Sequence, residues 1–305
     1  MTTAAITIDV DSLRFYRAIH GRSDANDAAT DDPIYTTALD RFFDLLEASR
    51  VPATLFLVGA DAPRYAARFA RAKPLGCEIA SHSFDHDYRL STRAPDVIAD
   101  DLAKADAALE PLNGGPIVGF RAPGYNVTPA LLEAVKARGH RYDSSLLPAP
   151  GYFAARAAAI ATYAVRQRPS ASLVGDPRQF AGPIDGPYPM NPDAAWRPVD
   201  GGALIELPMA VDPLTRSPLI GTTWTTLPSL LTRAWLRAAH KRLSCLVFEM
   251  HAIDLLDGSD HPDLASLAED QRDVRVSVSE KMRRFGELFR FLGENRSVRT
   301  LASLV

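Results

Sequence analysis

Short apolar runs alternate with amphipathic stretches along most of the chain, and this alternation restricts the folds that it can adopt. The apolar runs cover residues 4–10, 53–58, 77–80, 117–120, 141–142, 203–207 and 243–250. Strands that alternate with helices pair in parallel, and a continuously apolar strand is buried on both faces. The alternation predicts an α/β fold, a distorted (β/α) barrel with seven parallel strands. An open doubly wound sheet is the alternative.

The stretches between these runs have the spacing of helices. Leu39, Phe42, Phe43 and Leu46 fall at i, i+3, i+4 and i+7, which places them on one helix face. Further helices are expected near residues 98–109, 128–139, 228–239 and 282–292. In the second of these, a threonine cap is followed by a first-turn proline, a common way to begin a helix.

The segment from about residue 147 to residue 200 interrupts this rhythm. It is rich in Pro, Gly and Ala, and prolines at that density disfavour regular structure. We expect one Ala-rich helix near 153–166 within a long excursion over the barrel mouth, because excursions of this length are often functional. No linker or internal repeat divides the chain, so a single domain spanning residues 1–305 is predicted.

Charge and composition argue against several classes of protein. The net charge is −3 with acids and bases scattered, so no basic face for nucleic acid is expected. The two cysteines lie in apolar runs and are interpreted as buried thiols. The N-terminus lacks the pattern of a signal peptide, and no window approaches the ~18 apolar residues of a spanning helix. We expect a cytoplasmic protein without a transmembrane segment, and its oligomeric state stays open.

Two carboxylates, Asp9 and Asp11, end the first apolar run. In an extended chain both project to the same face, where two ionised carboxylates repel each other. A divalent cation relieves that repulsion. His82 and His86 are four residues apart, which on a helical turn places both rings on one side. Two histidines and one aspartate make a three-ligand metal site with open positions, and the second carboxylate is then available as a base.

Three further candidates also lie at strand ends. Arg121 follows the fourth run beside a Pro-Gly turn, where it would keep a neighbouring carboxylate ionised. His251 ends the seventh run and could protonate a leaving amine, although a hydrogen-bonded structural histidine fits the pattern equally well. Asp143 ends the fifth run and could orient His251 or Arg121.

The motifs resemble those of the polysaccharide deacetylase family, the NodB-homology enzymes similar to carbohydrate esterase family 4. The first motif looks like residues 7–11 in an Asp-x-Asp variant, and the second-strand signature looks like residues 51–56. The His-x-x-x-His motif is similar to residues 78–86, and the Arg-x-Pro motif to residues 120–125. The resemblance implies one catalytic deacetylase domain with a distorted seven-stranded (β/α) barrel of the NodB type.

The resemblance also implies roles for individual residues. Asp9 would be the general base, positioned by Arg121, and His251 would be the acid that protonates the departing amine. A backbone N–H at Tyr125 or a neighbour would stabilise the oxyanion. The metal would be held by Asp11, His82 and His86. Two departures stand out: the Asp-x-Asp motif leaves open which aspartate binds metal, and no aromatic residue follows Asp143.

The predicted function is metal-dependent removal of an N-acetyl or N-formyl group from an amino-sugar-containing carbohydrate. The substrate would be a sugar nucleotide, an oligosaccharide or a lipid-linked sugar. Zinc is the default metal for a His₂Asp site, and cobalt, nickel or manganese are alternatives. Two other readings stay open at this point. Two histidines and a carboxylate also bind iron in non-haem oxygenases, and the barrel could be a non-catalytic carbohydrate-binding module.

Overall fold

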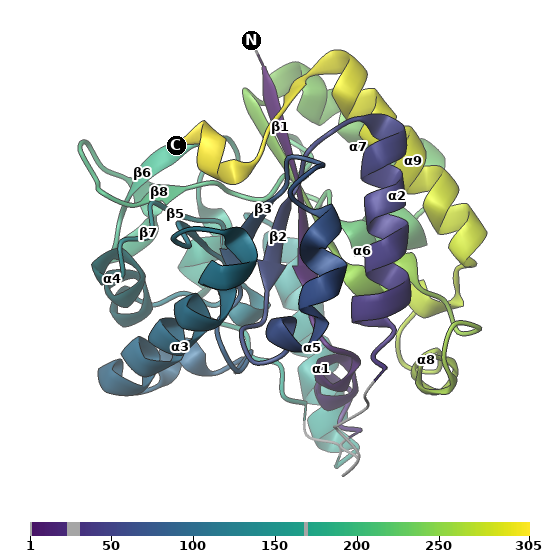
Figure 1. The fold of residues 1–305 in the computed structure, drawn as a ribbon, viewed down its shortest axis with the longest axis horizontal. Helices are drawn as coiled ribbons and strands as arrows, with labels where there is room; N and C mark the ends of the chain where they lie inside the picture. The colour runs from purple at the N-terminus through teal and green to yellow at the C-terminus, as the bar shows by residue number, and fades with distance from the viewer. Residues whose placement is uncertain (1, 23–30, 168–169) are drawn as a thin grey trace.

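The structure is a computed structural model that describes residues 2–22, 31–167 and 170–305. Strand β1 (Thr3–Val10) lies at the centre of a curled sheet, and the helices surround it (Figure 1). Within the described residues, none of the helices is both long enough and apolar enough to span a bilayer.

The strands around β1 run parallel, which brings their carboxyl ends to one edge of the sheet. On one side β1 pairs with β2 (Thr54–Leu57), followed by β3 (Glu78–Ser81), β4 (Gly119–Phe120), β5 (Tyr142–Asp143) and β8 (Ile205–Glu206). On the other side β1 pairs with β9 (Cys245–His251) along its whole length. The short β10 (Ser297–Val298) pairs with the first residues of β1 on the side opposite β9. The register sets Asp9 opposite both Phe56 and His251.

The sheet differs from the predicted barrel in two respects. A hairpin of β6 (Tyr188–Asn191) and β7 (Ala194–Pro198) joins β8 in antiparallel pairing, inside the segment where prolines predicted irregular structure. Pro198 lies in the outer strand and Pro192 in the turn, where a missing N–H is tolerated. Beyond β8 the chain meets β9 at isolated bridges such as Met209 with Val247. The curled α/β sheet agrees with the prediction, while a count of seven parallel strands is not confirmed.

The longer helices lie where the apolar spacing predicted them. They are α2 (Leu39–Ser49), α3 (Pro95–Asn113), α4 (Pro129–Ala137), α5 (Pro150–Val165), α7 (Ser229–Arg242) and α9 (Val278–Asn295). The α4 start is confirmed, because the Thr128 hydroxyl accepts a hydrogen bond from the Leu131 N–H. Three helices were not predicted: α1 (Leu13–Ile19), α6 (Gly221–Thr226) and α8 (Pro262–Leu267). Each has seven residues or fewer, too short to show a helical period.

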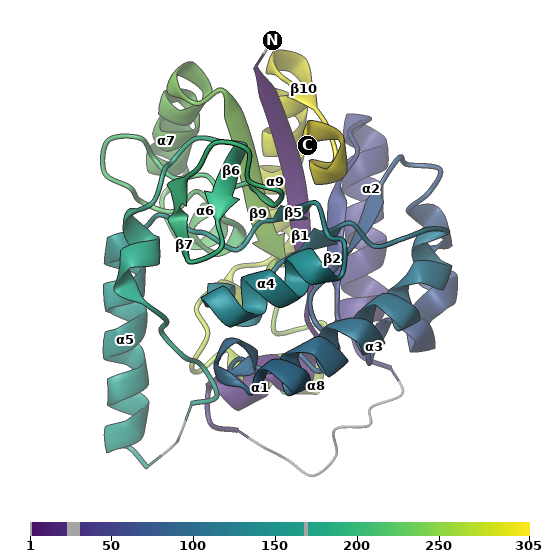
Figure 2. The same cartoon turned by 90° about the vertical axis from the view of Figure 1, so that its left-hand side faces the viewer.

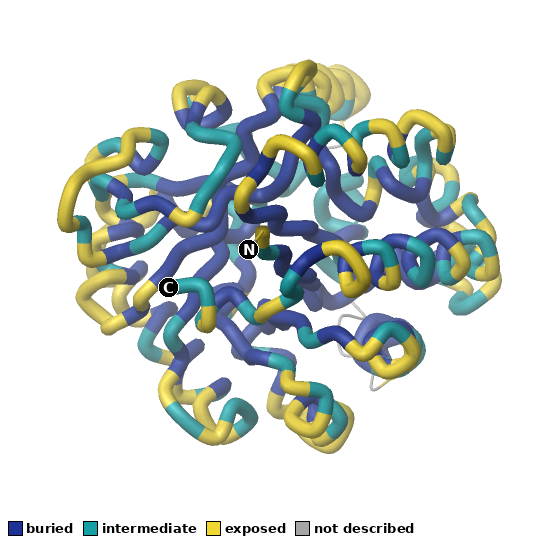
Figure 3. Tube along the Cα trace, turned by 90° about the horizontal axis from the view of Figure 1, so that it is seen from above, coloured by how far each residue is buried: buried dark blue, intermediate teal, exposed yellow. Residues whose placement is uncertain are grey.

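Apolar side chains fill both faces of the sheet, which keeps its strand ends in place. Phe56, Tyr142 and Val247 pack together in one buried cluster. The larger cluster, which includes Phe42 and Phe248, packs the sheet against α2 and α9. Seen from above, buried strands occupy the centre and the exposed residues lie mainly on the surrounding helices and loops (Figure 3).

Replacing Gly119 by alanine should destabilise the fold. A Cβ at this position would lie 2.0 Å from Cζ of Tyr142, whose side chain is fully buried and whose hydroxyl donates to Glu78. Overpacking of this kind costs about 1–3 kcal/mol, to be measured as the free energy of unfolding in urea. Gly151→Ala is the matched control, because a Cβ there meets open space. Equal stability of the two variants would contradict the packing argument.

Candidate metal and catalytic site

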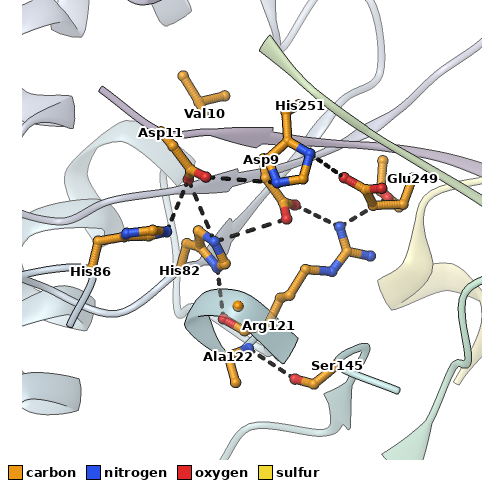
Figure 4. A network of polar contacts seen from close by, with 12 residues as sticks. Asp9, Val10, Asp11, His82, His86, Arg121, Ala122, Ser145, Glu249 and His251 are labelled. Carbon is orange, nitrogen blue, oxygen red and sulfur yellow. Dashed lines mark hydrogen bonds and ion pairs between the residues drawn. The ribbon is translucent and has the colours of Figure 1, made fainter. Parts of the chain in front are cut away.

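The predicted site residues converge at the carboxyl ends of four strands. Asp9 and Asp11 end β1, His82 follows β3, Arg121 follows β4 and His251 ends β9. The close-up view shows their side chains turned toward one another, with His86 reaching in from the loop after His82 (Figure 4). Carboxyl ends of parallel strands are where α/β barrels place their catalytic groups.

Asp11, His82 and His86 form a buried cluster suited to a metal ion. The Asp11 Oδ1 atom lies 3.4 Å from Nε2 of His82 and 3.4 Å from Nε2 of His86. One potential ligand atom from each residue lies within 4.8 Å of the others. Asp11 Oδ1 and both ring nitrogens of His86 are buried without a hydrogen-bond partner. Since buried polar atoms are normally satisfied, the orphaned atoms fit a divalent cation.

Burial and neighbouring charged groups shift the pKa values of Asp11 and His82. Burial would raise the pKa of the Asp11 carboxyl, but the nearby His86 and His82 rings outweigh it and hold that pKa well below its usual range. Burial lowers the pKa of His82, which favours the neutral ring that binds metals. The Nδ1 atom of His82 lies 2.7 Å from the Arg121 carbonyl oxygen. Donation there leaves Nε2 as the free lone pair facing Asp11.

The two histidines lie on a loop, which corrects the expectation of a helical turn. Their rings approach with centroids 4.8 Å apart. Ser83 and His86 both adopt left-handed backbone conformations, with φ of 65° and 52°. The Ser83 hydroxyl accepts a hydrogen bond from the His86 N–H and closes the loop. Uncommon conformations at non-glycine residues often mark functional positions, and here they turn both rings toward Asp11.

Asp9 and Arg121 form a fully buried ion pair beside the cluster. Arg121 Nη1 lies 2.6 Å from Asp9 Oδ1, and neither side chain is exposed. The same guanidinium donates to the Thr7 hydroxyl and to the Ser144 carbonyl and stacks on Phe56. Burial would lower the pKa of Arg121, but Asp9 and Glu249 raise it, so it stays charged. The second Asp9 oxygen has no hydrogen-bond partner and lies 3.8 Å from His82 Nε2.

His251 is paired with Glu249, a residue that the sequence analysis missed. The His251 Nδ1 atom lies 2.9 Å from Glu249 Oε1, and its Nε2 atom lies 3.8 Å from Asp11 Oδ2. Burial would lower the pKa of His251, but Glu249, Asp9 and Asp11 outweigh it and raise that pKa well above its ordinary value. Glu249 and His251 are two residues apart on β9 and so share a face. This spacing is the signal that could have identified the pair.

Asp143 lies behind the site rather than against His251 or Arg121. Its carboxylate accepts hydrogen bonds from the Ser145 hydroxyl, at 2.6 Å, and from the Ser145 N–H. Burial raises its pKa. Among the described residues, Ser144 takes the expected place beside Arg121, and Glu249 takes it beside His251. The prediction that Asp143 orients either residue directly is therefore corrected.

The Tyr125 N–H is also already engaged. It donates to the Ala122 carbonyl at 2.9 Å, within a turn in which Gly124 and Tyr125 both have positive φ. An amide bonded in this way is not free to bind an oxyanion, so the expectation for the Tyr125 N–H is corrected and only a neighbouring donor stays a prediction. The Tyr125 ring faces His251, with centroids 6.3 Å apart, and its hydroxyl is buried without a partner.

These groups line one cavity of about 400 Å³. Asp9, Asp11, His82, His86 and His251 lie on one part of its wall, and residues of α1, of α5 and of the 270–273 segment complete it. Helix α5 belongs to the Pro- and Gly-rich excursion and lies at the margin of the molecule (Figure 2). The cavity combines potential metal ligands, a buried carboxylate and a histidine, which is the set required for metal-assisted hydrolysis.

Comparison with known proteins agrees with this arrangement. The sequence model of the polysaccharide deacetylase family matches residues 27–142, which include His82, His86 and Arg121. No curated protein matches the chain. A structure from Mycobacterium smegmatis described as a polysaccharide deacetylase is 20% identical, with a TM-score of 0.59, over 99% of this chain and 88% of that one. It shows that the two chains share a fold.

Two further structures are more distant. A family 4 carbohydrate esterase from Streptomyces lividans is 13% identical with a TM-score of 0.44, over 98% of this chain and 91% of that one. The esterase domain of a xylanase from the hindgut metagenome of Trinervitermes trinervoides is also 13% identical, with a TM-score of 0.47, over 99% and 89% of the two chains. The family model's match to residues 27–142 confirms the resemblance that the motifs predicted.

Proposed function

We propose that this protein is a metal-dependent hydrolase that removes an N-acetyl or N-formyl group from an amino-sugar-containing carbohydrate. One observation carries the proposal. Orphaned ligand atoms of Asp11 and His86 lie in the same cavity as two further groups, each held by a charged partner. These are Asp9, held by Arg121, and His251, held by Glu249.

The residues that would hold the metal are Asp11, His82 and His86. Two imidazoles and one carboxylate suit zinc, with cobalt, nickel or manganese as substitutes. When bound, such an ion polarises a carbonyl oxygen and lowers the pKa of water to about 7. Asp9, Glu249 and His251 also bring potential ligand atoms together. The Arg121 guanidinium already neutralises Asp9, so we assign the metal to the first group.

Asp9 would act as the base in the hydrolysis. Its Oδ1 atom is occupied by Arg121, while its Oδ2 atom has no donor and is able to accept a proton from attacking water. The guanidinium has a second effect, because its contact at 2.6 Å holds the carboxylate in one orientation. A carboxylate held in one orientation, with one oxygen left free, meets the geometric requirement for general base catalysis.

His251 would deliver a proton to the departing amine. The Glu249 carboxylate forms an ion pair with Nδ1 at 2.9 Å, which fixes the ring orientation and leaves Nε2 directed toward the Asp11 side of the cavity. The partly exposed ring borders the cavity, whereas Glu249 is fully buried. Base and acid would then act on the same amide, Asp9 on the water and His251 on the nitrogen.

The substrate would be an N-acylated carbohydrate such as a sugar nucleotide, an oligosaccharide or a lipid-linked sugar. Tyr88, Tyr125 and Tyr152 line the cavity, and aromatic side chains of this kind suit the apolar face of a sugar ring. The cytoplasmic location and the single-domain organisation expected from the sequence stay predictions. Release of acetate or formate from a panel of N-acylated sugars, with added metal, tests the proposal directly.

His82→Ala should remove the bound metal. The variant loses one of three ligands and leaves Asp11 with a single imidazole partner. We expect the stoichiometric zinc of the wild type to be lost on dialysis, as measured by elemental analysis of the purified protein. His261→Asn is the matched control, since His261 caps α8 outside the cluster. Full metal content in the His82 variant would refute its role as a ligand.

Asp9→Asn should abolish turnover while metal is retained. The asparagine oxygen is still able to accept from Arg121, but the side chain is unable to take up a proton from water. Loss of a general base lowers kcat by about 10²- to 10⁴-fold, measured as acetate release by the metal-loaded enzyme. Loss of metal from this variant would instead show that Asp9 is the ligand and Asp11 the base.

His251→Ala should lower kcat far more than it changes KM, because the ring acts in the transition state.

Glu249→Gln should lower kcat by about 10- to 100-fold, a loss typical of residues that orient a functional histidine. If Glu249 acts through His251, the double variant will be no slower than His251→Ala alone. Fully additive losses would show that Glu249 acts independently of the ring.

A further inference from the structure

Helix α5 presents one face to the cavity. Tyr152, Arg156, Ile160 and Tyr163 fall at i, i+4, i+8 and i+11 and all line the cavity. Such spacing places side chains on a single helix face. Three of these side chains are aromatic or aliphatic, and the fourth is a guanidinium. Arg156 is therefore a cation on the wall of the proposed active site.

Within the described residues, the hydrogen-bond partners of Arg156 are all neutral. Its Nη1 atom donates to the Gly124 carbonyl at 3.0 Å, and its Nε and Nη2 atoms donate to the Ser172 hydroxyl at 3.0 and 2.7 Å. A guanidinium has five N–H donors, so donors are left over. Within residues 2–22, 31–167 and 170–305, the structure pairs Arg156 with no carboxylate.

Two arginines outside the cavity lining, Arg22 and Arg121, differ in this respect, whereas Arg272, which also lines the cavity, has no carboxylate partner among the described residues. Arg22 binds both Glu269 and Asp270, at 2.8 Å each, beside the 270–273 segment. Arg121 binds Asp9 at the cavity floor. An arginine that is half-buried beside a cavity, with neutral partners alone, carries an uncompensated charge. An anion that entered the cavity would balance that charge with charge-assisted hydrogen bonds.

The Tyr88 side chain connects the surroundings of Arg156 with the metal cluster, because it contacts His86 and packs beside Arg156 at Gly124. The Tyr88 ring meets the His86 ring edge-on, with centroids 4.8 Å apart. A Cβ on Gly124 would lie 2.8 Å from Arg156 Nη2 and 2.9 Å from Tyr88 Cδ1. Gly124 thus permits the arginine and the tyrosine to pack against the turn beside the site.

We propose that Arg156 binds an anionic group, a phosphate or a carboxylate, carried by the N-acylated sugar whose amide is cleaved. The inference rests on the proposed function and narrows its substrate class. The planar guanidinium fork matches both anions and is able to bind them in bidentate fashion. Tyr88 and Tyr152 line the same cavity and would offer aromatic faces to the sugar. The enzyme would then prefer charged saccharides, such as sugar phosphates or uronates, over neutral ones.

Three N-acetylglucosamine derivatives test this: the neutral sugar, its 1-phosphate and the corresponding uronic acid. We expect the wild type to favour at least one anionic derivative in kcat/KM by about tenfold or more, the scale of a charged hydrogen bond. Arg156→Gln should remove that preference and leave the neutral sugar within about twofold. The phosphate and carboxylate arms identify which anion is recognised.

Two further variants separate binding from a structural role. Arg156→Lys keeps the charge and should restore part of the anionic preference. Arg166→Gln changes an exposed arginine at the end of the same helix, outside the cavity, and should match the wild type. If Arg156→Gln slowed all three substrates equally, the side chain would only brace the Gly124 turn. Equal wild-type activity on the three substrates would likewise overturn the proposal.

Failure of the proposed function is distinguishable from failure of this inference. If the metal-loaded wild type released no acid from any N-acylated sugar, the hydrolase proposal would fall. Calorimetric titration with N-acetylglucosamine 1-phosphate then tests the anion subsite without turnover. Affinity at least about tenfold weaker in Arg156→Gln than in Arg166→Gln would support it. Equal affinity in the two variants would overturn it.

Discussion

The buried pair of Arg121 and Asp9 is the interaction on which the site depends. It joins the end of β1 to the end of β4, and through Ser144 it also reaches the chain beyond β5. Neither charge is exposed, so removal of either partner would strand the other in a medium that solvates it poorly. The bidentate and stacking capacity of arginine explains why the guanidinium tolerates this position: its donors reach Thr7 and Ser144, and its plane lies over Phe56.

A second constraint follows from that pair. With Asp9 neutralised by Arg121, the remaining carboxylate, Asp11, faces two imidazoles at 3.4 Å, and its Oδ1 atom has no hydrogen-bond partner. A protein does not normally bury such atoms unsatisfied, and a divalent cation is the simplest group that satisfies all three. In the proposed mechanism the two aspartates have different roles. Asp9 would keep a free oxygen to accept a proton, while Asp11 would bind the metal together with His82 and His86.

The sequence predicted the parts of this structure that depend on local pattern. Apolar runs end in Asp9, His82, Arg121 and His251, and parallel strands bring those ends together without further information. It did not predict Glu249 as the partner of His251, because a glutamate inside an apolar strand has no partner until the fold supplies one. The Tyr125 amide and the His82–His86 loop depended on turn conformations that spacing does not encode. Arg156 lies 35 positions beyond Arg121 and approaches the site only when α5 folds back toward it.

The groups proposed to hydrolyse the amide and the arginine proposed to bind the anion lie in different parts of the chain. Groups proposed to act on the amide lie at the ends of buried strands or in the loop after β3, where packing on both faces of the sheet restricts their movement. Arg156 and Tyr152, two of the groups proposed to select the sugar, lie on α5, whose outer face is exposed and whose buried contact is Phe153 stacked on Phe180. Side chains on the cavity-facing side of α5 could therefore be substituted without disturbing the Arg121–Asp9 pair. In this proposal, the preference for an anionic substrate would depend on a part of the chain separate from the residues that would hydrolyse the amide.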